Sequence, residues 1–234
     1  MSSVHRRIER ACARVGRDPA GVRLVAITKG HDADEVREVL VERGVRVLGE
    51  NRVQEWRTKA DAVGPGVEWH LVGHLQTNKV RYCRSFALLH GVDSLRLVDA
   101  LEAEGAQHAH VFPVLLQVNV SGELQKYGVA PDDLPDLVTQ LATRPHVRLE
   151  GLMTLAPYDP DPERARPVFR TLQALAERYA SGRTSMGMSG DFEVAIEEGA
   201  TWVRIGSALF AEDAELSGAS ATGDGVARAP EVQP

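Results

Sequence analysis

Apolar runs typical of buried strands alternate with amphipathic segments typical of helices along most of the chain. The strand candidates cover residues 22–28, 45–48, 68–73, 85–90, 111–120, 147–155, 184–188 and 202–205. The helix candidates that follow them cover about residues 32–43, 51–62, a short helix after Gln76, 95–104, 131–142, 162–180 and 190–198. Asp32 and Gly44 suit the two ends of the first of these helices, because Asp caps helix N-termini and Gly follows helix C-termini. A further amphipathic helix is expected over about residues 3–14.

This alternation predicts an α/β fold of the (β/α)8 TIM barrel type. Eight successive strand and helix units joined by right-handed crossovers fit a closed barrel better than an open sheet. A doubly wound sheet is the alternative, but no Gly-x-Gly-x-x-Gly pattern follows the first strand. We expect one domain over residues 1–212 and a disordered tail over residues 213–234, which is rich in Gly, Ala, Ser and Pro.

Composition narrows the function classes. The 234 residues are 43% hydrophobic and carry a net charge of −6, without the basic patch that nucleic-acid binding requires. No signal peptide and no apolar run long enough to span a bilayer is visible, so we expect a soluble, cytoplasmic protein. The cysteines, Cys12 and Cys83, are too few for a disulfide framework or a metal cluster, and no metal site is expected.

Lys29 ends the first strand candidate, directly before Gly30 and His31. The chain has four lysines among its 27 basic residues, so a lysine at a strand end suggests a need for an amine that can lose its proton. Such an amine can form a Schiff base with a carbonyl compound. A lysine that reaches solvent at the strand end is the simpler interpretation.

Other polar residues follow the strand candidates. In a barrel the carboxyl ends of the strands and the loops after them share one face, so Lys29, Asn51, His74, Asn119 and Met153 could converge there. His70 and His74 are four residues apart, but they lie on a strand and its loop, which is not the helical spacing of a zinc pair.

The loops after the seventh and eighth strands resemble a phosphate cradle. They read Ser-Met-Gly-Met-Ser-Gly-Asp over 185–191, with Ser189, and Gly-Ser-Ala over 206–208, with Gly206 and Ser207. Glycine allows close backbone approach, and hydroxyl and N–H groups bind a phosphate dianion. Gly-Ser turns also occur without a ligand.

An amine on the first strand and a phosphate cradle on the last two suit a phosphorylated aldehyde, of which pyridoxal 5′-phosphate (PLP) is one. Arg204 lies two residues before the second loop and could contact the pyridine nitrogen. A guanidinium donates a hydrogen bond and keeps its charge, so the ring nitrogen would stay unprotonated and the cofactor would be a poor electron sink. A structural ion pair is the other interpretation of Arg204.

The chain resembles the YggS/PROSC family of pyridoxal-phosphate-binding proteins in motifs that run in family order over about residues 4–211. The motifs cover residues 24–29 (LVAITK), 49–55 (GENRVQE), 69–79 (WHLVGHLQTNK), 117–120 (QVNV), 151–153 (GLM), 185–189 (SMGMS) and 203–207 (VRIGS). Thr28 stands where members often have Ser, and Gly30 and His31 also depart from the common pattern.

The resemblance implies a barrel similar to the N-terminal domain of alanine racemase, with PLP held as an aldimine on Lys29. It also implies phosphate contacts at Ser189, Gly206 and Ser207 and a ring-nitrogen contact at Arg204. Asn51, His74 and Met153 occupy family positions around the pocket.

The resemblance further implies PLP homeostasis in place of catalysis. Alanine racemase takes its second base, a tyrosine, from a second domain, and only the low-complexity tail follows Gly206 here. We therefore expect a monomeric carrier that has PLP-dependent apoenzymes as possible recipients.

Other functions stay open. A racemase-like enzyme would use Lys29 with Tyr127 or His74 as second base, and a cofactor-free Schiff-base aldolase would use Lys29 alone. An interaction protein would use its helix faces and acidic tail. Lys126 is either a second cation for the phosphate or a solvated loop lysine.

Overall fold

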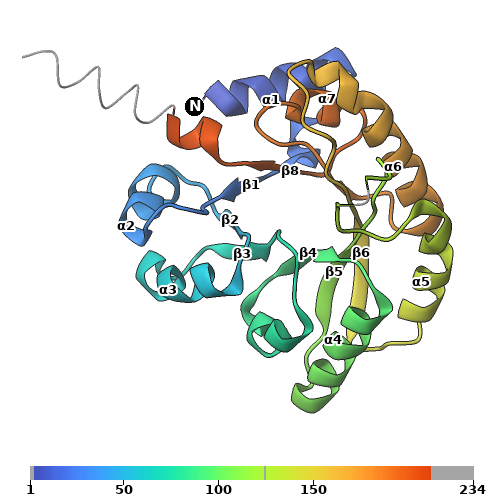
Figure 1. The fold of residues 1–234 in the computed structure, drawn as a ribbon. Coiled ribbons are helices and arrows are strands. Elements are labelled where there is room, and N and C mark those ends of the chain that lie inside the picture. Colours follow the sequence, from blue (N-terminus) through green and yellow to red (C-terminus); the bar gives the residue numbers. More distant parts are fainter. Residues whose placement is uncertain (1–2, 124, 212–234) are drawn as a thin grey trace, which may run out of the picture.

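Eight parallel strands close into a barrel in chain order in the computed structural model, which describes residues 3–123 and 125–211 (Figure 1). Each strand pairs with the next, and β8 pairs with β1. The strands are β1 (Arg23–Ile27), β2 (Val47–Glu50), β3 (Glu68–Leu71), β4 (Leu88–Val92), β5 (Phe112–Gln117), β6 (Val147–Met153), β7 (Thr184–Ser185) and β8 (Trp202–Ile205). The predicted (β/α)8 barrel is confirmed, and the tail predicted over residues 213–234 lies outside the described residues.

Helices surround this barrel (Figure 1). The α-helices are α1 (Ser3–Arg14), α2 (Ala33–Val36), α3 (Val53–Val63), α4 (Leu95–His108), α5 (Leu134–Leu141), α6 (Arg166–Tyr179) and α7 (Phe192–Glu197). Short 3-10 segments are η1 (Pro19–Gly21), η3 (Thr77–Ser85), η4 (Pro131–Asp133) and η5 (Pro162–Ala165), and η2 (Arg37–Val41) is a π-helical turn. Asp32 caps α2 as predicted, accepting a hydrogen bond from the backbone N–H of Glu35 at 2.9 Å.

Several predicted boundaries were wrong by a few residues. The second strand begins at Val47 and not at Val45, because the N–H of Val45 closes the preceding turn on the carbonyl of Leu40. The fourth begins at Leu88, since residues up to Ser85 belong to η3. The seventh is two residues long, because Gly187, at φ +88°, turns the chain out of the strand.

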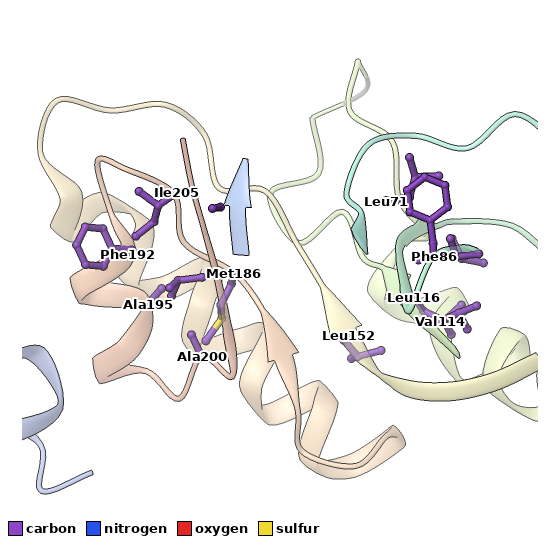
Figure 2. Close-up of a cluster of buried hydrophobic side chains, with 14 of the residues drawn as sticks. Leu71, Phe86, Val114, Leu116, Leu152, Met186, Phe192, Ala195, Ala200 and Ile205 are labelled. Carbon is purple, nitrogen blue, oxygen red and sulfur yellow. The ribbon is translucent and has the colours of Figure 1, made fainter. Parts of the chain in front are cut away.

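Side chains that point outward from the strands pack against the helices. Figure 2 shows part of this core, where Ile205 of β8 lies beside Phe192 of α7, with Ala195 of the same helix nearby. Alternation along each strand sends every second side chain outward, so this shell accounts for most of the buried apolar residues. No helix in the described part of the chain is long and apolar enough to cross a membrane.

Side chains that point inward form two unlike groups. One is an apolar cluster of Val25, Val72, Leu88, Leu115, Met153 and Trp202. The other is polar and fully or almost fully buried, and it contains His70, His90, Ser185 and Arg204. Branched apolar residues usually fill the interior of such a barrel, and a buried polar group is costly without a hydrogen-bond partner.

Acid is expected to destabilise the fold through the two buried histidines. Burial lowers the pKa of His70, and it lowers the pKa of His90 well below its usual value, where the nearby His70 and Arg204 add to the shift. The unfolded chain therefore takes up protons as the pH falls through about 6.5, while the folded chain does not. The contribution of the two histidines to the free energy of unfolding is therefore fully present above that pH. Below it, this contribution falls by roughly 1.4 kcal/mol per pH unit for each histidine that stays neutral in the folded chain.

Urea midpoints measured between pH 7.5 and pH 5 would check this expectation. A His90→Gln variant keeps only one of the two buried histidines, His70, so its urea midpoint should depend less steeply on pH. An equal slope in the variant and the wild type would contradict the assignment.

Candidate functional site

A cavity of about 380 Å³ opens at the carboxyl ends of β1 and β8. It brings together the predicted residues Lys29, Ser189, Arg204, Gly206 and Ser207. The remaining lining residues are Ile27, Ala156, Pro157, Tyr158, Asp159, Met188, Gly190 and Asp191. An amine, a guanidinium and two serine hydroxyls thus line one space, at the end of the barrel where such folds place their active sites.

Lys29 lies on an exposed turn directly after β1. The ammonium of Lys59, on α3, donates hydrogen bonds to the carbonyls of Thr28 and His31, each at 2.8 Å. These two carbonyls lie on either side of Lys29, so Lys59 holds the backbone from which the Lys29 side chain extends. Gly30 supports the same turn with φ +79°, a conformation that costs glycine little.

A buried ion pair lies beneath this turn. The Lys59 ammonium is 2.7 Å from Oε1 of Glu50, and the hydroxyl of Thr28 donates to the same oxygen at 2.5 Å. The second oxygen of Glu50 is buried with no hydrogen-bond partner in the described structure. Thr28 supplies a hydroxyl just as serine would, so its departure from the family pattern preserves this contact.

The two glycine-rich loops meet across the cavity. Ser207 donates a hydrogen bond from its hydroxyl to that of Ser189 at 3.2 Å, which joins the loop after β8 to the loop after β7. Asp191 orders the β7 loop by accepting from the backbone N–H of Met188 at 2.6 Å. A Cβ on Gly206 would lie 3.1 Å from the carbonyl of Ile27, so the close approach of β8 to β1 favours glycine here.

Arg204 reaches the cavity from the barrel interior. Its Nη1 donates to the hydroxyl of Ser185 at 2.6 Å, and its Nη2 donates to the carbonyl of Thr154 at 2.9 Å. Burial lowers the pKa of Arg204 to about 10, partly offset by the charge of Asp191. The guanidinium is therefore still charged at neutral pH, and two of its five N–H donors are used by these bonds.

The structure places the other three predicted residues elsewhere. Asn51 and His74 line a neighbouring cavity of about 730 Å³, together with Lys79 and Tyr127. The ring of His74 stacks on that of Tyr127, with centroids 3.8 Å apart, and its Nδ1 lies 3.1 Å from Asp93. Met153 is buried in the apolar cluster inside the barrel and lines neither cavity.

The loop after β5 does not reach the Lys29 cavity either. Asn119 donates to the carbonyl of Glu123 at 2.9 Å and orders its own loop. Lys126 forms an ion pair with Glu123 and lies 3.5 Å from the carbonyl of Leu155. These contacts give Lys126 a structural role in its loop.

Residues 1–213 match the family model described as alanine racemase, N-terminal domain. The chain is 43% identical to the pyridoxal phosphate homeostasis protein of Aquifex aeolicus over 220 residues, which cover 91% of this chain and 96% of that protein. It is 44% identical to the protein of the same name from Deinococcus radiodurans, with 87% and 96% covered. The chain belongs to the pyridoxal phosphate homeostasis protein family.

Solved structures agree with this family. PipY of Synechococcus elongatus, solved with PLP bound, is 33% identical and superposes with a TM-score of 0.74 over 87% of this chain and 99% of that one. Alanine racemase of Clostridium difficile superposes with a TM-score of 0.66 at 14% identity, over 88% of this chain and 56% of that one, which shows the shared fold. The predicted family and the predicted fold are both confirmed.

Three residues in or around the Lys29 cavity were not predicted from the sequence as part of the site. Lys59 could have been found, because it is one of only four lysines and lies on a helix next to the Lys29 strand. Ser185 is within a quoted motif, but its contact with Arg204 depends on the closure of β7 against β8. Tyr158 lines the Lys29 cavity and is 94% exposed, and no pattern in its loop indicates that position.

Proposed function

We propose that this protein binds PLP covalently through Lys29 and acts in PLP homeostasis. The observation that carries the proposal is the single cavity in which Lys29, the two serine loops and Arg204 meet. Support comes from relatives named pyridoxal phosphate homeostasis protein and from PipY, which was solved with PLP bound.

The cavity residues fit the chemical groups of PLP. The hydroxyls of Ser189 and Ser207 lie 3.2 Å apart, and Gly190 and Gly206 line the same cavity and allow a ligand to approach the backbone closely, which suits a phosphate. Arg204 has N–H donors beyond the two used by Ser185 and Thr154, which suits an unprotonated pyridine nitrogen. Lys29 is exposed at the cavity wall and can reach a ligand aldehyde.

When bound, PLP supplies an aldehyde that reacts with amines. Lys29 would hold the cofactor through its side-chain amine, because an amine condenses reversibly with an aldehyde and water is lost. Ser189 and Ser207 would hold the phosphate. Arg204 keeps its own proton at neutral pH, so it would donate to the ring nitrogen, keep that nitrogen unprotonated and disfavour carbanion chemistry.

We infer a carrier role over a racemase-like one. Tyr127 and His74, the residues considered as a second base, line the neighbouring cavity and stack on each other. Tyr158, which does line the Lys29 cavity, is almost fully exposed and so is not fixed by packing. The proposal includes release of PLP to PLP-dependent apoenzymes by a cytoplasmic monomer.

The test is titration of purified protein with PLP, followed by borohydride reduction and peptide mass analysis. We expect a visible absorption band that borohydride removes, and a pyridoxyl group on Lys29. A protein that gains no band would contradict the proposal, as would a label found on another lysine. Incubation with amino acids in deuterated water tests the racemase alternative, and we expect no exchange of the α-hydrogen.

A further inference from the structure

A continuous chain of hydrogen bonds runs through the barrel from the cavity to the opposite end. Arg204 contacts Ser185 at 2.6 Å, and the Ser185 hydroxyl lies 2.9 Å from Nδ1 of His90. His90 Nε2 lies 3.0 Å from Nδ1 of His70, and His70 Nε2 lies 2.9 Å from Oε1 of Glu68. The members come from β8, β7, β4 and β3, so only the closed barrel brings them together.

The directions of the bonds in this chain follow from the histidines and from the group at each end. Arg204 can only donate, and an ionised Glu68 can only accept. Burial lowers the pKa of both histidines and so favours neutral rings, each with one proton. A neutral His70 that donates from Nε2 to Glu68 accepts at Nδ1 from Nε2 of His90. Nδ1 of His90 then accepts from the hydroxyl of Ser185, which accepts from Arg204.

Burial and charge agree with this pattern. His70, His90 and Ser185 have no exposed surface, and burial is the main cause that lowers the pKa of each histidine. At the far end Glu68 is half-buried and pairs with Arg23 at 3.2 Å, and its hydrogen bond with His70 lowers the pKa of its carboxyl. The hydrogen-bond chain therefore ends at a charged acceptor that is partly exposed and can be substituted without entering the barrel interior.

We propose that Ser185, His90, His70 and Glu68 are positioning residues that hold Arg204 in the orientation needed for its ring-nitrogen contact. The inference rests on the proposed function, because it assigns Arg204 to the ring of PLP. Apolar side chains like those in the rest of the barrel interior would be enough if these positions only had to be filled. Such side chains form no hydrogen bonds and could not orient Arg204. If the acceptor at position 68 is replaced by a donor, every hydrogen bond between position 68 and Ser185 should reverse, and the surroundings of Arg204 should change.

The test is a charge swap at the far end, Arg23→Glu combined with Glu68→Lys. The swap keeps an ion pair between the same two positions but replaces the acceptor facing His70 with a donor. His70 and His90 should then each move their proton to Nδ1, and Ser185 would receive two donors and lose the acceptor for its own proton. Glu68→Gln is the matched control, because its amide oxygen still accepts from His70.

Nitrogen-15 spectra of the imidazoles, recorded without PLP, show which ring nitrogen of each histidine carries the proton. We expect Nε2-protonated histidines in the wild type and in Glu68→Gln, and Nδ1-protonated ones in the charge swap. In parallel, PLP should bind about tenfold more weakly to the swap, because the buried hydroxyl proton of Ser185 is left without an acceptor beside Arg204, and the absorption maximum of bound PLP should move.

Two results would overturn the inference. Unchanged proton positions in the swap would show that the chain does not have the inferred direction. Changed positions with unaltered PLP affinity and spectrum would show that the chain does not position Arg204. A wild type that binds no PLP would instead reject the proposed function, while the imidazole spectra would still test the chain.

Discussion

Replacement of Lys29 by alanine is expected to abolish the visible absorption band of the protein with PLP. The substitution removes the amine that bonds to the aldehyde, but it leaves the serine loops and Arg204 in place. Residual binding should therefore be non-covalent and weaker by two or more orders of magnitude, on the order of 3 kcal/mol. Absorbance titration and equilibrium dialysis would measure the two effects separately.

Lys79→Ala and Lys126→Ala are matched controls, because each removes one lysine amine outside the Lys29 cavity. Both should keep the band and bind PLP within about twofold of the wild type, since neither amine lines that cavity. Folding of all three variants is checked by circular dichroism. A Lys29→Ala protein that kept its band would refute the assignment of this lysine.

Lys59→Met is expected to cause the largest loss of stability among substitutions near the site. It leaves the carboxylate of Glu50, which is fully buried, without the ammonium at 2.7 Å. Removal of one partner of a buried ion pair costs about 3–5 kcal/mol, because the remaining charge has no compensation. Urea unfolding with and without the substitution would measure this loss.

The double variant Glu50→Leu with Lys59→Met separates the charge effect from the positioning effect. With both charges gone, much of the stability should return, since apolar replacement of a buried pair is often neutral. PLP binding should be weaker than in the wild type in both the single and the double variant, because no ammonium then holds the carbonyls of Thr28 and His31 around Lys29. A double variant as unstable as Lys59→Met would contradict the assigned cost of the unpaired charge.

The predicted elements differ from the observed ones mainly at their ends. Strands that are buried on both faces appear as continuous apolar runs, so those at 23–27 and 112–117 could be predicted from the sequence. The ends depend on local turns that an apolar run does not reveal, as when Gly187 turns the chain away from a seventh strand predicted to continue to residue 188. The first predicted helix was likewise only partly α-helical, because its second half forms the π-helical turn η2.

The predicted site residues likewise fall into those that the sequence could place together and those that it could not. Lys29, Arg204 and the serine loops were predictable because parallel strands in a barrel end on one face. Asn51 and His74 share that face but line a different cavity, and Met153 points into the interior. Strand order alone does not separate these cases, because the distances between neighbouring loops depend on side-chain packing.

The sequence by itself determined the barrel, the family and the amine, guanidinium and hydroxyl groups of the site, since periodicity and motif order are properties of the chain. Only the tertiary structure decided how those groups are held. The Glu50 and Lys59 pair and the chain from Arg204 to Glu68 join positions on different strands and helices. Their hydrogen bonds depend on distances of about 3 Å, which are set when the barrel closes and excludes water.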